Sequence, residues 1–284
     1  MAAVLGTNIA SIWASKNLQQ AQSDMANTVE RLSSGLRINR AKDDAAGLGI
    51  ANSLTQQING ANQGIRNLND GISMVQTAEG AIAAASEMAQ RILTLATQGI
   101  NGSMSADQTA SIQNEMKQLW ASIGSVQSRT KFSGVTLLGA SADVKINATN
   151  ISTDTITVDY SGSTKAIWVG TAAAGGTNGA VYDAIYATVA SGTFSTIIST
   201  TNTYITSLDT QRAKLGALQN QMDFAISNVT EMSANLTAAR SRVIDTDYAS
   251  ETASLTKGQI LQQAATAMLA QANQMPNVIL SLLK

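Results

Sequence analysis

Apolar residues recur every seven positions through the C-terminal third of this 284-residue chain. The series is Leu208, Leu215, Met222, Val229, Leu236 and Val243, with a companion stripe at Leu218, Ala225, Met232 and Ala239. Such a heptad seam is typical of helices that pack lengthwise. Similar registers run through residues 58–96 and 112–126. The only proline, Pro276, leaves nearly the whole chain without the strongest helix breaker, so long helices are permitted.

The order of these segments predicts a helical bundle with an insert. Turn residues and a candidate cap at 99–107 predict that the helices on either side form an antiparallel hairpin. The helix that carries the C-terminal seam then packs on this hairpin and completes the bundle, so both chain termini are expected at the same end of the bundle. In the Ser- and Thr-rich middle, polar and apolar residues alternate at 143–148 and 155–160, which predicts two strands. Residues 172–179 are expected to form a loop, and residues 182–190 fit a short helix or a strand. The predicted fold class is mainly α, with long terminal helices and an antiparallel coiled-coil-like bundle carrying a small β-containing insert.

Both chain ends are predicted to be amphipathic helices. Two such arms of about 40 residues would each be roughly 60 Å long. Their apolar stripes either pack against neighbouring copies of the chain or fold back into one intramolecular bundle, and the residues alone leave both alternatives open. The candidate interface residues are Leu5, Ile9, Leu18, Met25, Leu32, Leu261, Met268, Leu280 and Leu283. We therefore expect a structural, self-assembling protein.

Composition argues against several other classes. The chain has no Cys and no His, which removes disulfides, Cys/His zinc sites, catalytic thiols and the Ser-His-Asp triad. A net charge of −1 without a basic block argues against nucleic-acid binding. The chain has no uninterrupted apolar stretch of about 18 residues, so we expect no membrane-spanning helix. The first residues lack the pattern of a cleaved secretory signal. We expect no enzymatic activity and no cofactor.

Two acidic pairs are candidate catalytic or metal-binding carboxylates. Asp43 and Asp44 are adjacent, and Asp245 and Asp247 are alternate. Carboxylates at such spacing on helices do not converge on one substrate atom. We expect them to cap helices or to be solvated.

Strings near both ends of the chain are distinctive. ERLSSGLRIN at 30–39 and AKDDAAG at 41–47 are similar to the N-terminal signature of bacterial flagellins. ARSRVIDTDYA at 239–249 and QILQQA at 259–264 are similar to the C-terminus of that family. The resemblance covers about residues 1–140 and 205–284 in colinear order, so only the middle is unmatched.

This resemblance implies a subunit that polymerises into the flagellar filament used for motility. Residues 1–43 and 244–284 would form the inner tube, 44–135 and 205–243 the surrounding bundle, and 136–204 a small variable outer insert. The implied partners are further copies of the chain, an export chaperone, the filament cap and junction proteins. The implied location is extracellular, reached through flagellar export without a cleaved signal.

The family resemblance also suggests a surface for innate-immune recognition. Gln90, Arg91, Leu95 and Glu115 match the flagellin patch that vertebrate Toll-like receptor recognises, whereas Leu93 and Thr94 depart from it. In the alternative interpretation Arg91 and Glu115 are solvated or bridge subunits.

Two other functions are compatible with the whole sequence. One is a hook-filament junction protein, which would share the helical ends. The other is a surface-adhesive binding module that uses the Ser- and Thr-rich insert and its aromatic residues.

Overall fold

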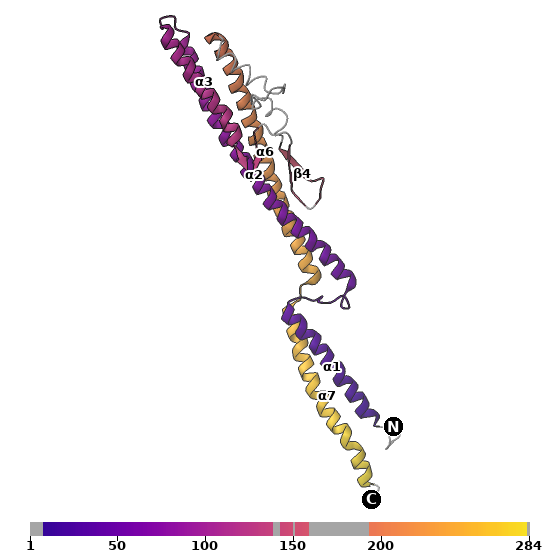
Figure 1. The fold of residues 1–284 in the computed structure, drawn as a ribbon. Coiled ribbons are helices and arrows are strands. Elements are labelled where there is room, and N and C mark those ends of the chain that lie inside the picture. The colour runs from indigo at the N-terminus through magenta and orange to yellow at the C-terminus, as the bar shows by residue number, and fades with distance from the viewer. Residues whose placement is uncertain (1–7, 139–142, 150, 159–192, 283–284) are drawn as a thin grey trace. The chain divides into compact units, whose positions relative to one another are not determined.

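The computed structural model describes residues 8–138, 143–149, 151–158 and 193–282. Helices dominate, as Figure 1 shows. In chain order the elements are α1 (Ile9–Ser34), α2 (Ala45–Gly99), α3 (Ala106–Arg129), β1 (Lys131–Phe132), β2 (Val135–Thr136), β3 (Val144–Asn147), β4 (Thr155–Val158), α6 (Phe194–Ile244) and α7 (Tyr248–Leu282). The predicted fold class is confirmed.

The chain divides into two compact units. One comprises Met1–Gln56 and Asn235–Lys284, and we call it the arm unit. The other comprises Gln57–Ala234, and we call it the bundle unit. The long helices α2 and α6 each contribute to both units.

The bundle unit packs α2, α3 and α6 around one apolar core. Heptad residues predicted from the sequence are buried in it: Leu68, Val75, Ile82, Ala89 and Ala96 of α2, Ile112, Met116 and Ile123 of α3, and Leu208, Leu215 and Met222 of α6. The amide of Gln219 donates to the carboxylate of Glu79 at 3.2 Å, and the Ser233 hydroxyl donates to Asn62 at 3.2 Å. These pairings set α6 antiparallel to α2.

The α6 helix begins at Phe194 and so includes residues 194–204, which the sequence analysis assigns to the insert. Ile197, Thr201 and Tyr204 are buried at helical spacing. The Tyr204 ring packs edge-on against Trp120 of α3, with centroids 4.9 Å apart and planes at 68°. The sequence analysis did not predict a helix in this Thr-rich segment, because threonine has only modest helix propensity. Here its hydroxyls bond to carbonyls four residues earlier, as Thr203 does to Ser199 at 3.0 Å.

The strands form two small antiparallel hairpins. β3 pairs with β4 so that Ile146 faces Ile156 in register, which confirms the two strands predicted at 143–148 and 155–160. The hairpin of β1 and β2 was not predicted, although its turn residues Ser133 and Gly134, both with positive φ, are a known two-residue hairpin signal. The segments 172–179 and 182–190 lie outside the described residues.

Two glycines of α2 let the β3–β4 hairpin lie directly on that helix. A Cβ built at Gly64 would overlap the carbonyl oxygen of Ala148. A Cβ at Gly71, two helical turns along, would overlap the side chain of Ile146. Glycine is therefore required here for close approach, although it weakens a helix interior.

Replacing Gly64 with alanine is expected to lower the free energy of unfolding by about 1–3 kcal/mol, because the added methyl group must displace backbone of the hairpin. The matched control is Gly80→Ala in the same helix, where a Cβ meets nothing within 4 Å. That substitution should raise stability by up to about 1 kcal/mol through helix propensity. Urea unfolding followed by circular dichroism measures both, and equal effects would contradict the close packing at Gly64.

The arm unit pairs α1 antiparallel with α7. The Asn8 side chain donates to the carbonyl of Ala272 at 2.7 Å near one end of the pair. The Arg31 guanidinium contacts Glu251 at 3.2 Å near the other end. The two predicted terminal helices thus pack against each other within one chain. In the described parts of the chain, no helix is long and apolar enough to cross a membrane.

A backbone hydrogen bond and a small apolar cluster hold the end of α1 close to the start of α7. Gly35 ends α1 in the left-handed region, at φ 71°. The backbone N–H of Arg37 then donates to the carbonyl of Ile244 at 2.6 Å. Ile38, Ala51 and Ile244 form a small buried cluster beside this bond. Residues far apart in the sequence are therefore held together at the base of both arms.

Candidate subunit interface on the terminal helices

Capping side chains fix where both arms begin. The Asn8 carboxamide oxygen accepts from the N–H of Ser11 at 3.1 Å at the start of α1. The Asp247 carboxylate accepts from the N–H of Ala249 at 3.0 Å at the start of α7. Each bond satisfies a backbone donor that the first helical turn leaves free. The arm helices are thus defined locally, before any neighbour contributes.

The seam between α1 and α7 is narrow and made of small residues. Ala21 and Ala272 are its buried side chains among the described residues of the two helices. Met25 lies on Gly258 of α7, where an added Cβ would meet the Met25 side chain at 3.6 Å. Two helices joined along small residues cover little of each other's surface, so most of each arm's apolar area remains outside the seam.

The predicted interface residues divide into two groups. Leu18, Met25 and Leu32 are half-buried. Ile9, Leu261 and Met268 are exposed, and Met268 keeps 63% of its surface accessible. Leu5, Leu283 and the side chain of Leu280 lie outside the described residues.

Among the described residues, α1 and α7 expose five large hydrophobic side chains that the sequence analysis did not single out. They are Ile12, Trp13, Val29, Tyr248 and Ile260, and Trp13 is 58% exposed. The prediction followed one stripe on each arm, and that choice excluded Ile12 and Trp13. The chain has only three tryptophans, so the presence of one in the first helix could have indicated that Trp13 is a candidate interface residue.

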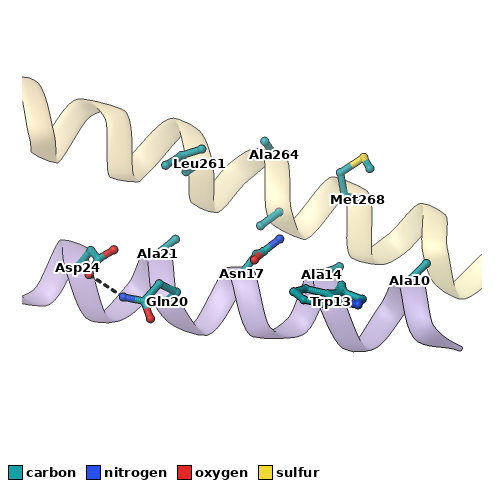
Figure 2. A pocket seen from close by; sticks show the side chains of 11 residues that line it. Ala10, Trp13, Ala14, Asn17, Gln20, Ala21, Asp24, Leu261, Ala264 and Met268 are labelled. Carbon is teal, nitrogen blue, oxygen red and sulfur yellow. Dashed lines mark hydrogen bonds between the residues drawn. The ribbon is translucent and has the colours of Figure 1, made fainter.

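Trp13 and Met268 line an open groove of about 500 Å³ between α1 and α7, shown in Figure 2. The α1 side also carries Ala10, Ala14, Asn17, Gln20, Ala21 and Asp24, and the α7 side Leu261, Ala264 and Ala265. Small alanines form much of the lining, with larger side chains at intervals. The shape suits an apolar side chain or helix from another molecule.

Charge around this groove is sparse. Asp24 is the ionisable residue of its lining, and its carboxylate accepts from Gln20 at 2.9 Å. The Lys16 ammonium lies 5.3 Å from the centre of the Trp13 ring, a cation–π contact, and Trp13 is nevertheless 58% exposed. Association at this surface would therefore depend on apolar burial rather than on ion pairs.

The residues of the predicted receptor patch are only partly brought together. Arg91 and Glu115 form an exposed ion pair at 2.8 Å between α2 and α3, and Gln90 is exposed beside Arg91 on α2. Leu95 is 2% exposed and belongs to the bundle core. Its side chain is therefore not accessible at the surface of the folded bundle.

Three of the four paired acidic residues bind nearby backbone N–H groups. The Asp44 carboxylate accepts from the N–H of Gly47 at 2.8 Å at the start of α2, and Asp247 caps α7. Asp43 accepts backbone N–H bonds from Arg40 and Asn39, and the Arg40 bond above all lowers the pKa of Asp43. That contribution to stability is present above the ordinary pKa of aspartate and is lost as the pH falls through the folded-state value. Among the described residues no three His, Cys, Asp or Glu side chains group to hold a metal ion.

Two family models match this chain, one on each side of an unmatched middle at residues 144–197. The bacterial flagellin N-terminal helical region matches residues 5–143, and the bacterial flagellin C-terminal helical region matches residues 198–283. The chain belongs to the bacterial flagellin family. It is thus a structural subunit of the flagellar filament, an extracellular polymer of identical subunits.

Individual relatives agree with this assignment over their full length. The chain is 36% identical to the flagellar filament 33 kDa core protein of Treponema phagedenis, covering 99% of this chain and 100% of the relative. It is 36% identical to the flagellin of Bacillus subtilis, covering 98% of each. Among solved structures, a protein described as flagellar hook-associated from Vibrio parahaemolyticus shares the fold, with a TM-score of 0.58 at 14% identity over 72% of this chain and 100% of that one.

Proposed function

We propose that the chain polymerises by burying the outer faces of α1 and α7 against neighbouring copies. The observation that carries this proposal is the row of large apolar side chains that the arm pair leaves in water: Ile9, Ile12, Trp13, Val29, Ile260, Leu261 and Met268. Monomeric proteins rarely leave such apolar area uncovered unless a partner covers it. Leu18, Met25 and Leu32 would be half-covered by the chain's own arms and completed by neighbours, and Leu5, Leu280 and Leu283 would extend the contact.

The energetics favour growth on an existing polymer. Each of these side chains is about half exposed, so covering the remainder contributes about 1 kcal/mol per residue. Bringing two free molecules together costs about 4–15 kcal/mol. One pairwise contact is therefore marginal, whereas a subunit that docks against several neighbours at once gains several such contacts for one loss of freedom. We propose that each contact joins two different surfaces of the subunit, because a contact of this kind need not close and can continue as a helix.

The chain is proposed to act without catalysis and without a cofactor. Asp44 and Asp247 cap α2 and α7, and the arms present large apolar side chains to solvent. A hook-associated protein shares this fold, so the fold by itself does not separate the filament role from the hook-filament junction role. The terminal helical regions match flagellin models, and relatives named as flagellins extend over the whole chain, which favours the filament role.

The same exposed apolar surface suggests which proteins bind the subunit before and during assembly. We propose that an export chaperone covers the arms in the cell, that a filament cap guides their docking, and that junction proteins contact the first subunits. Export would proceed through the flagellar route without cleavage of a signal peptide. Mass measurement of subunits recovered from filaments tests the last point, since a shortened N-terminus beyond removal of Met1 would contradict it.

A second role in innate recognition is supported by the exposed pair Arg91 and Glu115 with Gln90 beside it. We expect Arg91→Ala to reduce activation of vertebrate Toll-like receptor by about tenfold or more if these side chains form the contact. The control is Arg66→Ala, which removes an exposed guanidinium elsewhere on α2. Equal activation by both variants and the native protein would contradict the proposed patch.

The experiment that tests polymerisation compares the full chain with a version lacking residues 1–40 and 245–284. Heat-dissociated protein is cooled with filament seeds and inspected by electron microscopy. Filament growth from the full chain alone is expected, because only that chain carries the arms. Circular dichroism of the shortened chain checks that its bundle helices persist. Growth of the shortened chain at the full rate would contradict the role of the arms.

A further inference from the structure

The oxidisable sulfur of this chain is confined to methionine. The sequence has no Cys and ten Met. Of the methionines that the structure describes, Met74, Met116 and Met222 are buried, and Met25, Met88, Met104 and Met232 are half-buried. Met268 alone among the described methionines is mainly exposed, at 63%. Because oxidation of a thioether follows its accessibility, Met268 is the described sulfur that a peroxide in water reaches first.

The exposed thioether lies in a functionally sensitive place. Met268 lines the groove between α1 and α7 together with Trp13 and Leu261, as Figure 2 shows. The lining has no cationic side chain, because its ionisable residue is Asp24, an acceptor when charged. Its neutral side-chain donors are Trp13, Asn17 and Gln20, and the Gln20 amide already donates to Asp24. A sulfoxide oxygen covered by a neighbouring copy would lose its water without a charged partner in this groove.

We propose that Met268 is an oxidation site that controls assembly, an inference that rests on the proposed role of the arm surface. A lone pair of the sulfur attacks one oxygen of a hydroperoxide, the S–O bond forms and the O–O bond breaks. The sulfur loses two electrons to become the sulfoxide, and the peroxide is reduced to water or an alcohol. The product is polar and chiral, and it fits an apolar interface poorly. Oxidation of free subunits thus blocks their addition to a filament.

The same geometry makes the polymer protective. Once a neighbour covers the groove, peroxide no longer reaches the Met268 thioether. Subunits within a filament should therefore be oxidised at Met268 at least about tenfold more slowly than free subunits. Methionine sulfoxide reductase acting on free subunits should restore their ability to add.

The test exposes free full-length subunits to hydrogen peroxide, quantifies sulfoxide at each methionine by peptide mass spectrometry, and measures elongation of untreated seeds. Oxidised native subunits are expected to add about tenfold more slowly or worse. Met268→Leu keeps the volume and apolar character without the oxidisable sulfur, so its elongation should be insensitive to peroxide. The matched control is Met25→Leu, which removes a half-buried sulfur of the same unit and should stay sensitive.

Two results would overturn the inference. One is normal elongation by native subunits that carry the sulfoxide at Met268. The other is loss of elongation in peroxide-treated Met268→Leu equal to that of the native protein. Failure of unoxidised native protein to elongate seeds would instead refute the proposed assembly role and remove the basis of the inference.

Discussion

Replacing Trp13 with lysine is expected to raise the critical concentration for filament growth by about 100-fold or more. The substitution removes the largest exposed apolar side chain of the groove, which contributes about 1–2 kcal/mol when a neighbour covers its exposed half. It also places an ammonium beside Lys16, and covering that charge costs several kcal/mol more. Sedimentation of seeded filaments, with the remaining soluble subunit measured at equilibrium, gives the critical concentration directly.

The matched control for this substitution is Ser15→Lys. Ser15 is exposed on the same helix, does not line the groove, and gains the same charge next to the same Lys16. Its critical concentration should stay within about threefold of the native value, as expected for an exposed charge. If both lysine variants impair growth equally, the effect comes from charge on α1 in general and not from the groove.

The bundle core could be predicted from the sequence because its signal is local and periodic. Leu208, Leu215 and Met222 recur at the heptad spacing, and all three are buried in α6. The sequence analysis did not predict that Leu95 is buried, because it selected this residue from the family resemblance. The heptad register of the same helix selected Ala89 and Ala96 instead. The periodicity of α2 thus predicted its core better than the resemblance predicted its surface.

The arm pair could not be predicted in the same way. Contacts such as Asn8 with Ala272 join residues at opposite ends of the sequence, and no local pattern specifies them. The seam depends on Ala21, which lies on the stripe predicted for the first helix, and on Gly258, a small residue that a search for apolar stripes does not select. The exposed position of Trp13 depends on which face of α1 the seam covers, so it follows from the pairing and not from the sequence of α1 alone.

Replacing Trp120 with alanine is expected to lower the free energy of unfolding by about 3–5 kcal/mol. Trp120 is fully buried, and its ring packs edge-on against Tyr204, so truncation leaves a cavity between α3 and α6. A double-mutant cycle with Tyr204→Ala should give a coupling of about 0.5–1.5 kcal/mol for the aromatic pair. Urea unfolding monitored by circular dichroism measures each term.

The informative control is the same change at the other described tryptophan. Trp13→Ala removes a ring that is 58% exposed in the monomer, so the unfolding free energy of the bundle unit should change by less than about 0.5 kcal/mol. The two variants should then separate the properties of the chain, because Trp120→Ala weakens the fold whereas Trp13→Ala weakens polymerisation of a stable monomer. Comparable losses of monomer stability in both would mean that the Trp13 ring packs within its own chain, and the groove would then not be an assembly surface.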